Sequence, residues 1–129
     1  MGTPQPKERD KPKKKVWKTT YADKMFSKFI TQRDGKCLRC STTDNLTNSH
    51  YWRRGHSGTR FHPDNCITLC HTCHSEWENL KNYDYKVFML VRLGEDNYNA
   101  VERLARTFKN RGEAVMECME LLKAKRNKV

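Results

Sequence analysis

Two pairs of cysteines with the spacing Cys-x-x-Cys constrain the fold of this chain more than any other feature. They are 37-CLRC-40 and 70-CHTC-73. One such pair places two thiolates on a metal ion, and two pairs complete a tetrahedral site with no open coordination position. The spacing therefore predicts a structural zinc ion, with two disulfides as the main alternative. The predicted ligands are Cys37, Cys40, Cys70 and Cys73.

The composition favours the metal over the disulfides. Of the 129 residues, 36% are hydrophobic and 32% are charged, so the core is small and gains from a metal staple. The chain has no run of about 18 apolar residues, and no apolar segment follows its basic N-terminus as in a secretory signal. We therefore expect a cytoplasmic protein, in which clustered cysteines bind metal more often than they pair.

The charge indicates a polyanionic partner. Lysine and arginine outnumber the acidic residues by 26 to 15, for a net charge of +11, which exceeds the magnitude of ~2–8 usual for a small soluble domain. DNA or another nucleic acid fits this excess, although charge also serves solubility alone. Residues 1–18 hold three prolines and seven basic residues, and we expect them to form a flexible basic tail that contacts phosphates or has no role.

The order of apolar and turn residues predicts a single α+β domain over residues 19–129. Its core, residues 35–81, should contain two short strands and a helix, followed by a helical region over residues 84–126. Trp77 and Leu80 should face inward from the core helix, and Phe108 should lie on an apolar helical stripe. The expected helices are 20–34, 71–80, 85–93, 97–110 and 112–126, and the expected strands are 46–52 and 66–69.

The segment between the cysteine pairs contains more histidines than a zinc site needs. Residues 41–69 separate the pairs, more than the roughly 15–20 of a simple zinc ribbon. His50 lies on the first expected strand, and His74 follows Cys73 on the first turn of a helix, where it should point away from the zinc. A neutral imidazole with a pKa of about 6.5 accepts a proton from water near neutral pH. We therefore predict that His50 and His74 belong to a second, hydrolytic site. The alternative is that both histidines have structural roles.

The other cysteines and histidines in and near this segment, and its Asn and Trp residues, have simpler interpretations. We expect Cys66 and Cys118 to be buried free thiols and His71 to be exposed. Asn65 follows a Pro-Asp turn sequence, so it is either a turn residue or part of the second site. Trp52 precedes two arginines, which makes it the best candidate for stacking on a base or inserting into a groove of DNA.

The order of these residues resembles the zinc-stapled HNH endonucleases, which have the ββα-metal fold. The resemblance covers 37-CLRC-40, then His50, then 65-NCITLCHTCH-74. A narrower similarity is to phage recombination nucleases of the NinG (Rap) type. It rests on 49-SHYWRRGHSGTRFHPDN-65 and 82-NYDYKVFMLVRLG-94.

The resemblance implies a metal-dependent DNA endonuclease that acts in phage recombination or DNA processing, in the host cytoplasm, and leaves 5′-phosphate and 3′-hydroxyl ends. His50 would be the general base, Asn65 would orient it or bind the metal, and His74 would bind Mg²⁺ or Mn²⁺. Phosphates would be contacted by Arg53, Arg54 and Arg60.

Two departures keep a rival interpretation open. Many HNH sites have a metal-binding Asp just before the general base, where this chain has Ser49, and the NinG-type pattern usually ends CxxCN rather than CxxCH. The rival is a non-catalytic zinc module that binds nucleic acid, or an accessory subunit of a larger nuclease. The resemblance also admits a homodimer or an assembly with phage replication or recombination proteins.

Overall fold

The computed structural model describes residues 16–80 and 82–126. Most of the predicted basic tail, residues 1–15, lies outside these ranges. Within them, no helix is both long enough and apolar enough to cross a membrane. The described residues form an α+β structure of five α-helices and a two-stranded sheet, with the four-cysteine cluster that the sequence predicts. The elements in order are α1 (Thr19–Asp34), β1 (Leu46–His50), the 3-10 turn η2 (Pro63–Asn65), β2 (Cys66–Cys70), α2 (His71–Asn79), α3 (Asn82–Leu93), α4 (Glu95–Arg106) and α5 (Arg111–Arg126).

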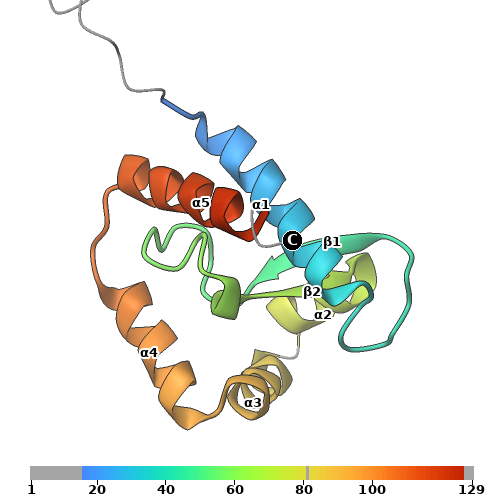
Figure 1. Cartoon of the computed structure of the whole chain (residues 1–129). Helices are drawn as coiled ribbons and strands as arrows, with labels where there is room; N and C mark the ends of the chain where they lie inside the picture. The colour runs from blue at the N-terminus through green and yellow to red at the C-terminus, as the bar shows by residue number, and fades with distance from the viewer. Residues whose placement is uncertain (1–15, 81, 127–129) are drawn as a thin grey trace, which may run out of the picture.

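The centre of the molecule is an antiparallel hairpin that continues directly into a helix (Figure 1). β1 pairs with β2 from Leu46 opposite Cys70 to His50 opposite Cys66. All five residues of β2 are buried. Cys70 ends this strand and also caps α2, because its sulfur accepts the backbone N–H of Cys73. The cysteine pair therefore joins strand to helix without a loop.

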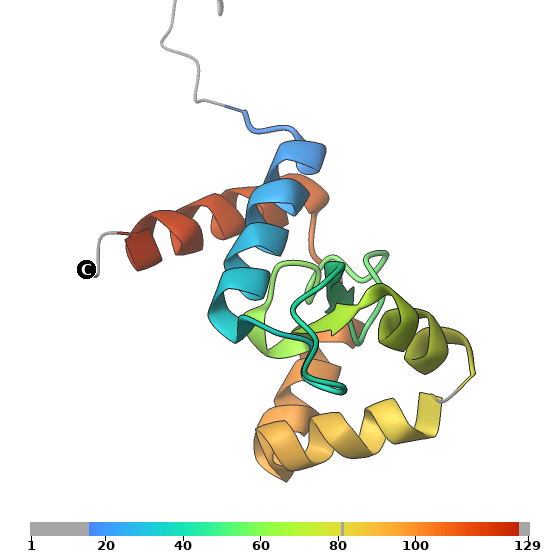
Figure 2. The same ribbon diagram turned by 90° about the vertical axis from the view of Figure 1, so that its right-hand side faces the viewer.

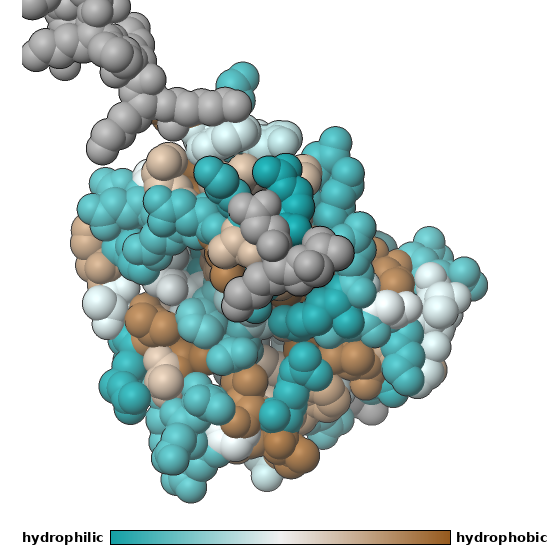
Figure 3. Space-filling model, in the orientation of Figure 1, coloured by the Kyte–Doolittle hydropathy of each residue, from teal (hydrophilic) through white to brown (hydrophobic). Residues whose placement is uncertain are grey.

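The sheet separates two apolar clusters, because successive side chains of a strand point to opposite faces. Ile67 and Leu69 pack with α2 and α3, while Cys66 packs with α1 and α5. In both views of the ribbon, α1 and α5 lie on one side of the sheet and α3 on the other (Figures 1 and 2). On the face drawn in Figure 3, hydrophilic residues predominate and hydrophobic residues lie in separate patches.

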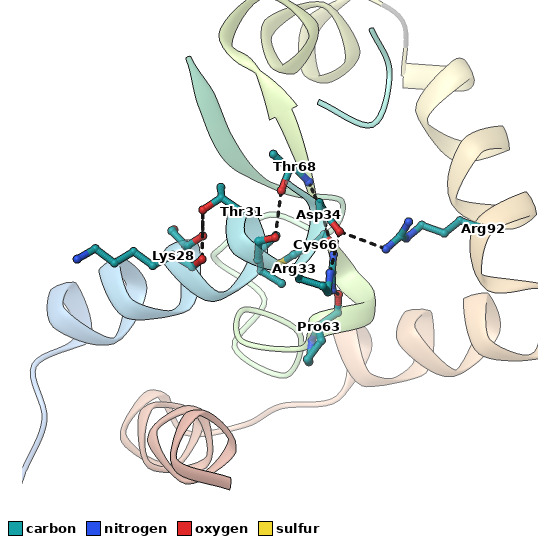
Figure 4. A network of polar contacts seen from close by, with 10 residues as sticks. Lys28, Thr31, Arg33, Asp34, Pro63, Cys66, Thr68 and Arg92 are labelled. Atoms are coloured by element: carbon teal, nitrogen blue, oxygen red, sulfur yellow. Dashed lines mark hydrogen bonds and ion pairs between the residues drawn. The ribbon is translucent and has the colours of Figure 1, made fainter. Parts of the chain in front are cut away.

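A polar joint fixes the end of α1 against the start of β2 (Figure 4). Arg33 donates to the carbonyls of Pro63 and Cys66, at 2.9 and 2.7 Å. The Asp34 carboxylate accepts the backbone N–H of Thr68 at 2.8 Å. Burial alone would raise the pKa of Asp34, but hydrogen bonds from Arg33 and Thr68 outweigh it and lower that pKa. The position of α1 relative to the sheet is therefore set by charge-assisted hydrogen bonds.

The predicted order of elements is confirmed, but several predicted ends are wrong. β1 ends at His50 rather than residue 52, because the Asn65 side chain takes the backbone N–H of Trp52. α4 ends at Arg106, where Thr107 adopts an extended conformation, so Phe108 leaves the helical stripe and is 90% exposed. Leu80 follows the last residue of α2 and is 81% exposed, whereas Trp77 is buried as predicted.

Candidate zinc centre and active site

The four predicted zinc ligands converge on one point. The sulfurs of Cys37, Cys40, Cys70 and Cys73 all lie within 4.8 Å of one another. The Cys40 and Cys70 sulfurs are 3.7 Å apart. Tetrahedral zinc with Zn–S bonds of about 2.3 Å separates its sulfurs by about 3.8 Å, so the cluster has the size that zinc requires. All six cysteines of the chain are free thiols, and Cys66 and Cys118 are buried away from the cluster as predicted.

The protonation of these thiols also fits a cation. Burial would raise the pKa of Cys37, but hydrogen bonds from backbone N–H groups, that of Cys40 first, lower it to about 6. By contrast, burial and the neighbouring thiols raise the pKa of Cys73 to about 12. Without a metal ion, the protein thus favours a thiolate at Cys37 and keeps the neighbouring Cys73 thiol protonated. A bound Zn²⁺ ion would compensate the charge of all four.

The second predicted site is a cavity of about 810 Å³ bounded by α1, β1 and α2. It contains four of the residues selected from the sequence: His50, His74, Arg53 and Arg54. Residues from α1 that the sequence did not indicate form the opposite wall. The polar residues that complete the lining include Asp23, Lys24, Ser27, Lys28, Thr31, Thr47, Asn48 and Glu78.

His50 is held as a neutral imidazole with a defined tautomer. Its Nε2 lies 2.9 Å from the carbonyl oxygen of Arg60. A carbonyl only accepts, so Nε2 carries the proton and Nδ1 keeps its lone pair. Burial lowers the pKa of His50 to about 4. At neutral pH the ring is therefore an uncharged proton acceptor through Nδ1.

Arg60, which was predicted to contact a phosphate, lies between His50 and Asp23 of α1. Its guanidinium donates two hydrogen bonds to Asp23 of α1, at 3.0 and 2.6 Å, and its side chain is 13% exposed. This bidentate pair fixes the residue whose carbonyl holds His50. Arg54 also lies near Asp23, at 3.8 Å, but its side chain remains 62% exposed.

Asn65, which was predicted to orient His50 or bind the metal, holds the loop that follows His50. The residue is fully buried and does not line the cavity. Its amide oxygen accepts the backbone N–H of Trp52, and its amide nitrogen donates to the carbonyls of Trp52 and Thr59. The amide is therefore committed to the loop backbone, and it acts on His50 only through the fold of that loop.

His74 and Glu78 form a pair that the prediction identified only in part. The Thr47 hydroxyl lies 2.8 Å from the carbonyl oxygen of Leu69 and 2.8 Å from Nδ1 of His74. On the other side of the ring, Nε2 of His74 lies 2.8 Å from a carboxylate oxygen of Glu78. An imidazole nitrogen and a carboxylate oxygen at this distance share either a proton or, in its place, a metal ion.

Two further residues lie outside the cavity. Ser49 is fully buried, and its hydroxyl lies 2.8 Å from that of Tyr85. Trp52, the predicted DNA-stacking residue, is half-buried: its ring centroid lies 5.4 Å from that of His56 and 5.6 Å from the Arg106 guanidinium carbon.

Sequence reasoning missed Glu78 and the wall formed by α1. Glu78 follows His74 by four residues on α2, a spacing that places both side chains on one face of the helix. That spacing was a signal in the sequence from which the pair could have been predicted. Lys24 and Lys28 carried no such signal, because only the tertiary packing of α1 beside β1 brings them to the cavity.

Comparison with known proteins identifies the chain by family alone. No curated protein and no solved structure matches it. The family described as Bacteriophage Lambda NinG protein matches residues 4–129, nearly the whole length. The chain therefore belongs to the NinG family of phage proteins.

Proposed function

We propose that this protein is a metal-dependent DNA endonuclease of the HNH type. The observation that carries the proposal is that one basic cavity contains both a candidate general base, His50, and a candidate metal-binding pair, His74 and Glu78. Membership of a phage family is compatible with a role in DNA recombination or processing.

His50 would activate the attacking water. Its Nδ1 is the unprotonated nitrogen, because Nε2 donates to the Arg60 carbonyl. With a pKa of about 4, the ring is neutral throughout the physiological range, and it takes a proton only as the water attacks. The Asp23–Arg60 ion pair and the Asn65 amide keep the ring in place during that step.

The groups that would hold a divalent cation are Nε2 of His74 and the carboxylate of Glu78. With Nε2 unprotonated, the two groups present facing lone pairs that fit such an ion, and a hydrogen bond from Nδ1 to the Thr47 hydroxyl would favour that tautomer. When bound, Mg²⁺ or Mn²⁺ would stabilise the charge that develops on the phosphate and the leaving 3′-oxygen. A carboxylate, an imidazole and several waters suit Mg²⁺ or Mn²⁺.

The dimensions of the cavity suit one phosphodiester between these groups. Thr47, which contacts His74, and His50 lie three residues apart on β1, about 10 Å along the strand. Arg53 and Arg54 on one side and Lys24 and Lys28 on the other supply cations for the flanking phosphates. The backbone of a DNA strand would therefore cross the cavity between α1 and the loop after β1.

The zinc centre would contribute by position only. Four thiolates leave zinc no place for a substrate. Cys70 and Cys73 are ligand positions that also begin α2, and His74 is the next residue. The metal that closes the fold would thus fix the start of the helix that carries the His–Glu pair.

Cleavage of supercoiled plasmid and of branched DNA with Mg²⁺ or Mn²⁺ tests this proposal. Wild-type protein should nick, and His50→Ala should lower the rate by about 10²–10⁴-fold with DNA binding retained. His71→Ala is the matched control, since His71 is an exposed histidine at the start of α2. Wild-type protein that binds DNA and cleaves no form with either metal would end the enzyme proposal.

One observation favours a non-catalytic zinc module instead. Ser49 stands where many HNH sites have a metal-binding Asp, and it is buried against Tyr85. In that case Glu78 and protonated His74 would form a plain ion pair, and the protein would bind DNA equally well with or without divalent metal. Addition of phage recombination proteins to the cleavage assay would separate this module from an accessory subunit of a larger nuclease.

A further inference from the structure

A second hollow lies on the other flank of α1, away from the proposed active site. It is a groove of about 790 Å³ between α1 and α5, whose helices lie side by side on one side of the sheet (Figures 1 and 2). The groove and the cavity have Lys28 in common. The apolar residues of its floor include Tyr21, Met25, Phe29, Met116, Met119 and Leu122.

This floor remains accessible to a partner. Tyr21 is 42% exposed and Met116 is 37% exposed, although both helices are packed against the core through Phe26 and Val115. Three methionines lie in one groove, and methionine side chains adapt their shape to irregular apolar partners. A floor of this kind suits the apolar face of a helix.

The rim of the groove is basic. Lys123, Lys125 and Arg126 extend along the last turn of α5, and none of them forms an ion pair within residues 16–80 and 82–126. Glu120 is the acidic residue in the lining. A ligand of this surface must therefore combine apolar side chains with negative charge.

We propose that the α1–α5 groove binds an acidic amphipathic helix of a partner protein. Its apolar face would lie on the methionine-rich floor, and its carboxylates would pair with the cations of α5. A helix parallel to the 16 residues of α5 would span about 24 Å, or four to five turns. Recognition would use apolar residues at positions i, i+3, i+4 and i+7.

Charge disfavours the other occupants. A second copy would bring one basic rim against another, and residues 1–15 of this chain carry six basic residues against two acidic ones. DNA matches the rim but not the floor, where the Trp17 and Tyr21 rings stack on each other with centroids 5.3 Å apart. An acidic, apolar polypeptide is the ligand class that fits both parts.

A synthetic peptide tests the proposal without any need for nuclease activity. The probe is a fluorescein-labelled 18-residue helix with leucines at i, i+3, i+4 and i+7 of each repeat and glutamates on both flanks. The control is an isomer of the same composition without the apolar stripe. Fluorescence anisotropy should detect binding of the first peptide only, and binding should weaken as salt is raised.

Charge reversal locates the binding surface. The double substitution Lys123→Glu and Lys125→Glu should weaken peptide binding by about tenfold or more, because two rim cations become repulsive. Lys86→Glu, an exposed lysine of α3, is the matched control and should leave binding unchanged. Met116→Ala should weaken binding through the floor.

Several outcomes would overturn the proposal. They are equal binding of the two peptides, no binding of either, or equal losses in the rim and Lys86 variants. Loss of duplex DNA binding in the rim variant, with no peptide binding by wild type, would assign the groove to nucleic acid. A concentration-dependent dimer in sedimentation that Met116→Ala disrupts would assign it to a second copy.

Discussion

The four-cysteine cluster and the proposed active-site cavity are built in opposite ways. The cysteines come as two local pairs, and each pair forms its own short turn in which a backbone N–H donates to a sulfur. The cavity is assembled from α1, β1, the following loop and α2, which are held together by ion pairs and buried amides. The first site depends on spacing along the chain, and the second on tertiary packing. Loss of one should therefore unfold the protein, whereas loss of the other should disable a protein that remains folded.

Cys70→Ser tests this contrast with the largest expected effect. Cys70 is a zinc ligand position, the last residue of β2 and the cap of α2. Its loss should release the metal and unfold the core at 25 °C, because metal binding supplies folding free energy in such sites. Circular dichroism and metal analysis measure the two effects.

Cys66→Ala is the matched control for that substitution. Cys66 is also a fully buried cysteine of β2, but it lies outside the cluster. It should keep its metal and lose only the roughly 1 kcal/mol that removal of one small buried side-chain atom costs. An unchanged melting curve and metal content in Cys70→Ser would remove the structural zinc.

Glu78→Gln should disable the cavity without unfolding the protein. The substitution leaves an amide where a carboxylate faces Nε2 of His74. We expect the affinity for Mn²⁺ to fall by about 10–100-fold, with the melting temperature and DNA binding nearly unchanged. Calorimetric titration with Mn²⁺ measures the affinity, and Glu113→Gln on the exposed first turn of α5 is the control. Equal Mn²⁺ affinity in wild type and Glu78→Gln would mean that the pair is an ordinary ion pair.

The same contrast decides how much of the molecule was predictable from sequence. The spacing of the cysteines and the position of His74 after Cys73 predicted the four-cysteine cluster and placed His74 outside it. The order of apolar segments and of the turn residues between them predicted the order of the helices and strands. Helix ends were predicted less well, because periodicity does not reveal where Thr107 leaves the helix or where the Asn65 side chain interrupts a strand.

The roles within the cavity were harder to predict than its members. Arg60 and Asn65 have the right chemistry to bind a phosphate and a metal, but their partners lie on α1 and across the loop. Such partners are set by long-range packing, so residue type alone did not reveal them. Lys24 and Lys28 were missed for the same reason.

Asn65→Ala should have a smaller effect on stability than Cys70→Ser, and should loosen the loop beside the cavity without disturbing the four-cysteine cluster. It removes three hydrogen bonds between the buried Asn65 amide and the loop backbone: one that the amide oxygen accepts and two that the amide nitrogen donates. Unsatisfied buried groups cost about 1–3 kcal/mol, so the urea midpoint should fall measurably while the metal content stays the same. Asn97→Ala, which removes an exposed hydrogen bond to Leu93, is the control. A midpoint equal to that of the control would mean that Asn65 does not hold the loop.

The smallest expected effect is a pH dependence of stability that belongs to His50. Its pKa is about 4 in the folded protein because of burial, and about 6.5 in an unfolded chain. Between these values the unfolded state binds more protons, so acidification from pH 6.5 toward pH 4 destabilises the fold, and above pH 6.5 the contribution is constant. Burial also lowers the pKa of His62, which adds in the same direction. His50→Gln removes only the first contribution, so its urea midpoint should fall less steeply than that of wild type between pH 6.5 and 5. Parallel slopes for the two proteins would contradict the neutral, half-buried imidazole on which the general-base role depends.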